Sequence, residues 1–363
     1  MNYNSEPNKK TVYFNTAGSG LLSKDSVEAA CNFQQATLIN SSAVFLQWLL
    51  ETLPELRKKT AKLLGASENE VAFVPNFSYG LLPVIDSLKP HLHKVLLYKE
   101  DYPSLNLPFE LSGFETTYVE SPDGYHIHID DIKKAIDKDK PEIVAISEVQ
   151  FLTGFRTDIS ELGKYCKEKD IVFIVDGTQS SGAINHAFSK MPVDVVISSS
   201  YKWLNGGFGS AVLCIKEGFF KKFPPAFAGY GSMKISPDNW EYTPSFKSFE
   251  PGHMNASGLL QLEKAIDEKL VMGLENIEQH NQVLIKKLLD GLTPLPYKIK
   301  GCKKMEERLS IVCFEADETL YNYLTGQGFT FTWRKGLIRV APHFYNTEEE
   351  IEELLQALKE YKR

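Results

Sequence analysis

Short runs of consecutive apolar residues recur along the first 220 positions, and amphipathic stretches separate them. Apolar runs rich in β-branched residues predict strands covered on both faces, whereas apolar residues spaced three and four apart predict helices. We expect strands at 71–75, 94–98, 142–147, 171–176, 193–198 and 210–215. We expect helices at 53–65, 130–137 and 158–170. This alternation predicts an α/β fold with a mostly parallel central sheet wrapped by helices.

The pattern changes after about residue 250. A long helical stretch at 256–292 is followed by strand-like runs at 308–316, 329–333 and 337–341. The chain closes on a helix, because Thr347 and Glu350 form a capping box. We therefore expect a second, smaller α+β domain at the C-terminal end. The expected division is a large domain at 15–255 and a small domain made of 1–14 and 256–363.

Composition excludes several classes of protein. The 40 Lys and Arg residues against 47 Asp and Glu residues give a net charge of -7, so we expect no nucleic-acid partner. No apolar run approaches the roughly 20 residues of a membrane span, and the N-terminus lacks a secretory signal pattern. The five cysteines are scattered, with no CxxC pair or metal-like cluster, which predicts reduced thiols, no metal and a cytoplasmic location.

Polar side chains follow two of the predicted strands directly. "IVFIVDGTQ" ends its strand on Asp176, with Gln179 three residues later, and "VDVVISSSYKW" continues into Ser199, Tyr201 and Lys202. Ligands of α/β sheets gather at the carboxyl ends of strands. A lysine at the end of a buried strand is costly to desolvate, so its amine is expected to react with a carbonyl group.

Two more strand ends complete this set. "VAFVPNFSYG" passes through Asn76, Phe77 and Ser78 into a helix, whose first N–H groups can bind an anion. "KVLLYKEDY" places Asp101 and Tyr102 just past another strand. We expect an amine, a carboxylate, an aromatic ring and an anion cradle on four neighbouring strand ends. These groups match the aldehyde, ring nitrogen, ring face and phosphate of pyridoxal 5'-phosphate.

At these residues the chain resembles the class V aminotransferase family, the branch of fold-type I pyridoxal-phosphate enzymes that includes cysteine desulfurases and isopenicillin N epimerase-like proteins. The resemblance runs from "YFNTAGSGLL" (13–22) to "GLIRVAPHFYNTEEEI" (336–351). It implies that Lys202 is the Schiff-base lysine and that Asp176 partners the pyridinium nitrogen. It also implies that Gln179 hydrogen-bonds the ring hydroxyl.

The same resemblance implies further site residues. Contacts to the cofactor phosphate are implied for Phe77, Ser78, Ser199 and Tyr201. Tyr102 falls where relatives commonly stack a histidine on the cofactor. His253, in "FEPGHMNASG" (249–258), falls in a loop that reaches the phosphate of a neighbouring subunit, at a place where a threonine is common. Arg339 resembles the arginine that binds the substrate α-carboxylate. A homodimer with its active site at the subunit interface is therefore expected.

The residues leave several reactions open. Transamination between an amino acid and a 2-oxo acid is the expected activity, and a phosphoserine-type enzyme would use Arg334 and His343 as extra cations. Epimerisation or racemisation, with Tyr102 as a second proton donor, is an alternative, as is a C–S or C–Se lyase. Desulfuration through an enzyme thiol is disfavoured, because "GFTFTWRKGLIRV" (328–340) has no cysteine and Cys313 falls in an apolar strand. A protein that binds the cofactor without turnover is the alternative of a different class.

Overall fold

A seven-stranded sheet forms the centre of the computed structural model, which describes residues 11–225, 227–236, 239–242 and 244–361. From one edge to the other its strands are β2 (Val71–Val74), β8 (Ala211–Ile215), β7 (Val195–Ser199), β6 (Val172–Asp176), β5 (Ile143–Ser147), β3 (Lys94–Tyr98) and β4 (Glu115–Val119). All of them run in one direction except β8, which is antiparallel to both of its neighbours. The expected mostly parallel sheet is thus confirmed.

Six of these strands lie within two residues of the expected ranges, and β4 is the one that the apolar pattern missed. Its sequence, Glu-Thr-Thr-Tyr-Val, is exposed or half-buried at every position but the last. A strand at the edge of a sheet needs no continuous apolar run, because only part of it is covered.

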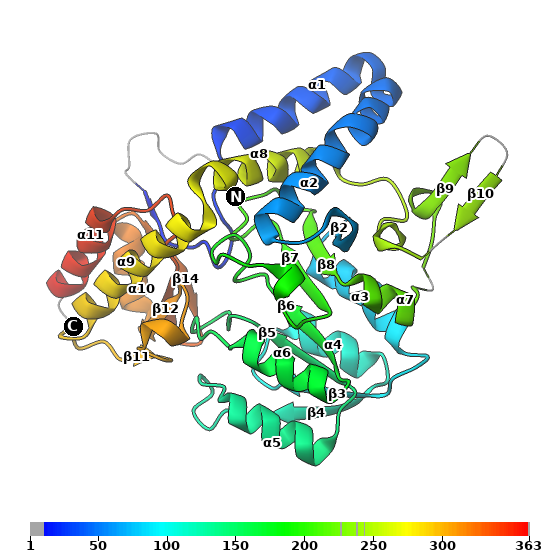
Figure 1. Ribbon diagram of the computed structural model, residues 1–363. Coiled ribbons are helices and arrows are strands. Elements are labelled where there is room, and N and C mark those ends of the chain that lie inside the picture. Colours follow the sequence, from blue (N-terminus) through cyan, green and yellow to red (C-terminus); the bar gives the residue numbers. More distant parts are fainter. Residues whose placement is uncertain (1–10, 226, 237–238, 243, 362–363) are drawn as a thin grey trace.

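Helices cover both faces of the sheet, and the residues of each strand alternate between the two layers. On one face pack α3 (Phe77–Leu88), α4 (Pro103–Leu111) and α7 (Glu217–Lys222). On the other face pack α2 (Leu53–Leu64), α5 (Ile129–Asp139), α6 (Ile159–Glu168) and α8 (Ala256–Met272). Helix α1 (Lys24–Gln47) lies alongside α8 (Figure 1). The hairpin of β9 (Met233–Ser236) and β10 (Asn239–Tyr242) projects from the rest of the molecule (Figure 1).

The C-terminal part has its own antiparallel sheet. Its strands are β11 (Ile299–Lys300), β12 (Val312–Glu315), β15 (Leu337–Val340) and β14 (Thr332–Arg334), in that order. Helices α9 (Leu274–Leu292), α10 (Glu318–Gly326) and α11 (Glu348–Glu360) share one core with this sheet. A separate parallel pair joins β1 (Val12–Tyr13) to β13 (Phe329–Thr330). The strand expected at 329–333 is therefore two strands in different sheets.

The long helix expected at 256–292 is likewise two helices. Gly273, with φ of 81°, separates α8 from α9, and a residue with a side chain would be strained in this left-handed region. The break has a packing consequence, since α8 packs against the core of the large sheet while the later turns of α9 pack in the C-terminal core. The domain boundaries proposed above stay a prediction.

Within the described ranges, no helix has both the length and the apolar character that crossing a lipid bilayer requires.

Candidate active site

The polar residues expected at the carboxyl ends of strands come from β2, β3, β6 and β7. The sequence had suggested four neighbouring strands, but the structure does not place them consecutively. Strand β8 lies between β2 and β7, and β5 lies between β6 and β3. Because the four strands are parallel to one another, their carboxyl ends still open on the same edge of the sheet. The residues of the site are therefore spread over a wider part of the sheet edge than expected, but they remain on the same edge.

Lys202 follows β7 and is only 7% exposed. Its Nζ lies 5.5 Å from the centre of the Tyr102 ring and 5.7 Å from that of Tyr201. No carboxylate of the described residues forms an ion pair with this amine. Burial lowers the pKa of Lys202 to about 8, although the negative charge of Asp176 acts in the opposite direction. A lysine with a lowered pKa loses its proton readily, which suits it to act as a nucleophile or a base.

Asp176 is the last residue of β6 and is buried. One of its carboxylate oxygens accepts a hydrogen bond from the Thr178 N–H at 2.8 Å. Burial raises the pKa of Asp176 to about 6, while Thr178 lowers it and the nearby charge of Asp101 raises it further. A buried carboxylate of this kind is stabilised by a cation beside it.

Asp101 is a second buried carboxylate, and it serves a different purpose. It accepts hydrogen bonds from the backbone N–H groups of Ser147 and Tyr102, both at 2.7 Å. These bonds tie the loop after β3 to the end of β5. Asp101 thereby positions Tyr102, which begins the turn into α4.

Gln179 connects the Asp176 loop to the Lys202 loop. Its side-chain oxygen accepts a hydrogen bond from the indole N–H of Trp203 at 2.7 Å, and its Nε2 donates to the Ala17 carbonyl at 3.1 Å. Gln179 therefore holds the residue next to Lys202 in place. Its expected bond to a cofactor hydroxyl stays a prediction.

The anion cradle expected at the start of α3 has the geometry of a capped helix N-terminus. The Asn76 side chain accepts a hydrogen bond from the Tyr79 N–H at 3.0 Å. Phe77 packs its ring in the core, and Ser78 is half-buried in the first turn. Backbone N–H groups in this turn point out of the helix and favour a negative charge.

Ser199 and Tyr201, which were expected to add phosphate contacts, lie just before Lys202 in the sequence. Ser199 is buried, and its N–H donates to the Thr178 hydroxyl at 3.2 Å. The Tyr201 ring stacks on Phe208, with 5.0 Å between ring centres. Their contacts to a phosphate stay predictions.

Arg339 lies on β15 and faces the site from the C-terminal sheet. Its Nη1 donates to the Phe151 carbonyl at 2.7 Å, and its Nη2 contacts the Thr332 hydroxyl at 3.3 Å. Its Nε is buried and has no hydrogen-bond partner. Burial and, after it, the charge of Arg334 lower the pKa of Arg339 to about 10. A buried guanidinium without a carboxylate among the described residues is suited to bind an anion.

Aromatic rings connect Arg339 to Lys202. Phe151, whose carbonyl binds Arg339, contacts the Tyr102 ring edge-on at 5.3 Å, and Tyr102 is the ring next to the Lys202 amine. The amine and the guanidinium therefore border one space, although 137 positions separate them in the sequence (339 − 202). No sequence pattern described above had assigned Phe151 to this site.

Two expected residues are placed elsewhere. His253 is exposed, stacks on Phe45 at 5.0 Å between ring centres, and lines a separate cavity of about 610 Å³ beside Tyr79. Its role toward a neighbouring subunit stays a prediction. His343 is wholly buried, with its Nε2 3.1 Å from the Trp203 carbonyl and 3.4 Å from Lys269 Nζ. The suggestion that His343 binds a substrate phosphate is wrong, because no substrate can reach that ring.

Sequence reasoning missed the support of the Lys202 loop by the N-terminal segment. The Gly20 N–H donates to the Tyr201 carbonyl at 2.7 Å. A Cβ atom on Gly20 would lie 2.1 Å from the Lys202 carbonyl oxygen, so only glycine fits there. In the sequence, only the two glycines of "NTAGSG" (15–20) indicated that this segment approaches another part of the backbone closely.

Comparisons with known proteins identify the family of the chain. The family model described as Aminotransferase class-V matches residues 12–326. A protein of Pyrococcus abyssi (strain GE5 / Orsay) named probable cysteine desulfurase is 26% identical, over 97% of this chain and 94% of its own.

Solved structures share the fold. A structure of the cystine C–S lyase C-DES with its reaction product, cysteine persulfide, has a TM-score of 0.87 at 21% identity and covers 98% of both chains. A C-DES mutant with glycine covalently linked to the PLP cofactor has a TM-score of 0.88, also at 21% identity, over 97% of both chains. With a family match over most of its length and a fold-type I architecture, the chain belongs to the class V aminotransferase family of pyridoxal-phosphate-dependent enzymes.

Proposed function

We propose that the chain is a C–S lyase that cleaves the Cβ–S bond of a cysteine-derived amino acid by elimination, without using an enzyme thiol. The observation that carries this proposal is the placement of Lys202 and Arg339 around one site, together with the full burial of Cys313, the cysteine that pairs with Arg339 across β12 and β15. The similarity to a probable cysteine desulfurase supports the choice of a sulfur-containing substrate.

The residues of the site fit pyridoxal phosphate. Lys202 is a buried amine with a lowered pKa, which suits covalent attachment of the cofactor aldehyde. Asp176 is a buried carboxylate that a cationic ring nitrogen would stabilise, and the first turn of α3 suits a phosphate. When bound, the cofactor supplies an electron sink for negative charge that develops at the substrate Cα. Further contacts are proposed from Gln179, Tyr102, Phe77, Ser78, Ser199, Tyr201 and, in a homodimer, His253.

The protein side of the reaction needs two groups. Arg339 binds the substrate α-carboxylate through its two Nη atoms and its unpartnered Nε. This orients the substrate with its Cα toward Lys202. Lys202 then takes the Cα proton and delivers a proton to the departing sulfur. Tyr102 lies beside the amine, with its ring centre 5.5 Å from Nζ.

The segment before Arg339 explains why an enzyme thiol has no place in this proposal. Strands β14 and β15 are joined by only Lys335 and Gly336, whose φ angles are 53° and 71°. Positive φ at both central residues is typical of a tight type I′ hairpin, which leaves no loop to carry a cysteine. Cys313, opposite Arg339 on β12, is fully buried, and burial raises the pKa of its thiol to about 12.

Transamination is the second candidate function. It requires a proton-carrying amine and a carboxylate-binding guanidinium, and Lys202 with Arg339 can serve an amino acid and a 2-oxo acid in turn. The family description supports this candidate. Racemisation through Tyr102 would instead convert an L-amino acid to its D-form without releasing any fragment.

One product assay separates these reactions. The purified holoenzyme is incubated with L-cystine, L-cysteine and a panel of other amino acids, with and without a 2-oxo acid. Elimination predicts pyruvate, ammonia and a sulfur product without any 2-oxo acid. Transamination predicts a new amino acid only when the 2-oxo acid is present. Lys202→Ala should abolish both, and borohydride reduction of the native holoenzyme should attach the cofactor to Lys202.

The thiol variants test the elimination step itself. Cys313→Ser and alkylation of Cys31, the exposed cysteine on α1, should leave pyruvate formation unchanged. Loss of activity in either case would show that an enzyme thiol takes part. Amino transfer without pyruvate release from any sulfur amino acid would overturn the lyase proposal in favour of the second candidate.

A further inference from the structure

Arg334 is a cation next to the proposed carboxylate site, and no reaction step described above uses it. It lies on β14, its side chain is exposed, and its guanidinium carbon lies 5.4 Å from the centre of the Phe151 ring. Within the described ranges, no carboxylate forms an ion pair with it. The Phe151 ring that it covers belongs to the residue whose carbonyl binds Arg339.

The strand register places the two arginines on the same face of the sheet. Thr332 pairs with Arg339 and Arg334 pairs with Leu337, so Arg334 is the diagonal neighbour of Arg339. Diagonal neighbours on one face lie roughly 7–8 Å apart. Both guanidinium groups therefore border Phe151, and the charge of Arg334 is near enough to lower the pKa of Arg339.

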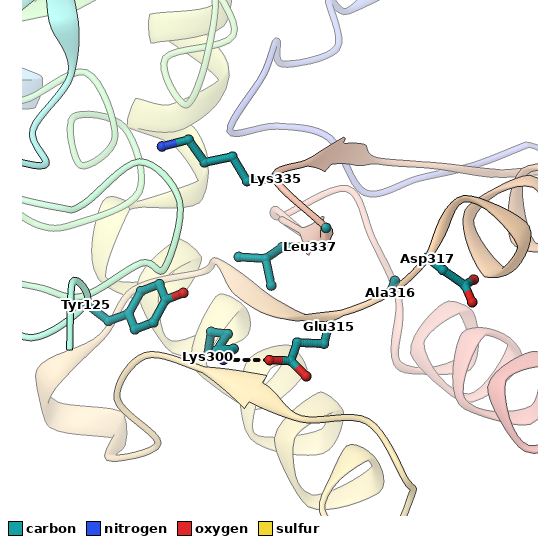
Figure 2. Close-up of a pocket in the computed structure, with 8 residues that line it drawn as sticks. Tyr125, Lys300, Glu315, Ala316, Asp317, Lys335 and Leu337 are labelled. Carbon is teal, nitrogen blue, oxygen red and sulfur yellow. Dashed lines mark ion pairs between the residues drawn. The ribbon is translucent and has the colours of Figure 1, made fainter.

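Two positive charges this close, to which no carboxylate of the described residues is paired, are stabilised by anions. The groove on the other side of Leu337 differs in this respect (Figure 2). That groove holds the carboxylates Glu315 and Asp317 beside its cations Lys300 and Lys335, and Lys300 pairs with Glu315 at 2.6 Å. Phe151 and Leu337 belong to one apolar cluster with Leu152 and Cys313.

We propose that Arg334 selects substrates whose side chain ends in a second anionic group, which it binds while Arg339 holds the α-carboxylate. This rests on the proposed function, namely that amino acids react at Lys202. Because the two arginines stand at diagonal positions of one sheet face, the pair suits an amino acid whose distal anion lies several bonds beyond Cβ. The planar, charged guanidinium on an aromatic ring is well suited to a carboxylate.

A matched ligand pair tests the proposal on the holoenzyme. S-Carboxymethyl-L-cysteine and S-carbamoylmethyl-L-cysteine have the same size and the same C–S bond, but only the first has a distal negative charge. We expect the wild-type chain to prefer the carboxylate in kcat/KM and, by calorimetry, in Kd, by about tenfold or more. Arg334→Gln should bring both ratios close to one, and Arg334→Lys should give intermediate values.

Lys335→Gln is the matched control. Lys335 is the adjacent cation in the same hairpin, and its side chain extends away from the Lys300–Glu315 ion pair (Figure 2). Removing its charge should leave the preference intact. Equal affinity of the wild-type chain for the two ligands, no binding of the carboxylate, or an unchanged preference in Arg334→Gln would each overturn the proposal. If the preference persists in Kd but neither ligand yields pyruvate, the lyase proposal fails while the role of Arg334 stands.

Discussion

Removing one partner of the buried ion pair of Arg57 and Glu250 should destabilise the chain strongly. Two parallel hydrogen bonds join the side chains, each 2.8 Å long, and both side chains are less than 10% exposed. Arg57 also donates to the Val71 carbonyl at 2.6 Å, and Glu250 accepts from the Phe73 N–H at 2.7 Å. The pair thus joins α2, strand β2 and the segment that continues to His253.

Glu250→Gln removes the negative charge but keeps an oxygen for the Phe73 N–H. The Arg57 guanidinium is then a buried charge without its counterion, which costs about 3–5 kcal/mol. Typical domains have a free energy of unfolding of about 5–15 kcal/mol, so this change should be prominent. In Arg57→Met/Glu250→Gln both charges are gone. We expect a loss of only about 1–2 kcal/mol there, mainly from the Val71 carbonyl that loses its donor.

Urea unfolding, followed by far-UV circular dichroism and extrapolated to water, measures these differences. Asp290→Asn serves as the control, since it breaks the exposed pair with Lys286 and should change the free energy of unfolding by less than about 0.5 kcal/mol. A Glu250→Gln protein within 1 kcal/mol of wild type would refute the reasoning. A double variant less stable than Glu250→Gln would refute it as well.

Three further predictions concern the Lys202 loop and its surroundings. Gly20→Ala should destabilise the chain by about 1–3 kcal/mol and reduce turnover, because the added methyl group overlaps the Lys202 carbonyl. Gly218→Ala is the control: its added methyl group meets nothing within 4 Å, so stability and turnover should not change. Parallel measurements of activity and unfolding check both variants. Burial lowers the pKa of Lys269 to about 7, far below the value of about 10.4 in the unfolded chain. Between about pH 7 and 10.4 the unfolded chain therefore binds more protons than the folded chain, so the free energy of unfolding should rise with pH in this range. The slope of the unfolding free energy against pH, measured at pH 7.5, 8.5 and 9.5, should be larger in the wild type than in Lys269→Met by an amount approaching about 1.4 kcal/mol per pH unit, and equal slopes would contradict this assignment. Asp176→Asn should reduce turnover of the holoenzyme. In the cofactor-free protein it should lower the pKa of Lys202 further below about 8, measured from the pH dependence of its chemical labelling. An unchanged or raised pKa would count against the electrostatic effect of Asp176 on Lys202.

The sequence alone determined the class of fold and most of the chemistry at the strand ends. Strand and helix periodicity are local properties, so alternating apolar runs sufficed to locate six strands of the large sheet. The placement of Asp176 and Lys202 directly after such runs was readable for the same reason, because each residue's position depends only on its own strand.

The tertiary structure decided everything that depends on pairing between distant segments. Strand order inserted β8 and β5 between the expected neighbours, and the β14–β15 register brought two arginines to one residue, Phe151: Arg334 to its ring and Arg339 to its carbonyl. Burial also depends on distant segments. The sequence suggested that His343 could bind a substrate, but Trp203 and Lys269, from other parts of the chain, enclose its ring. Which surfaces cover a polar side chain is set by the packing of the whole chain, and no local pattern encodes it.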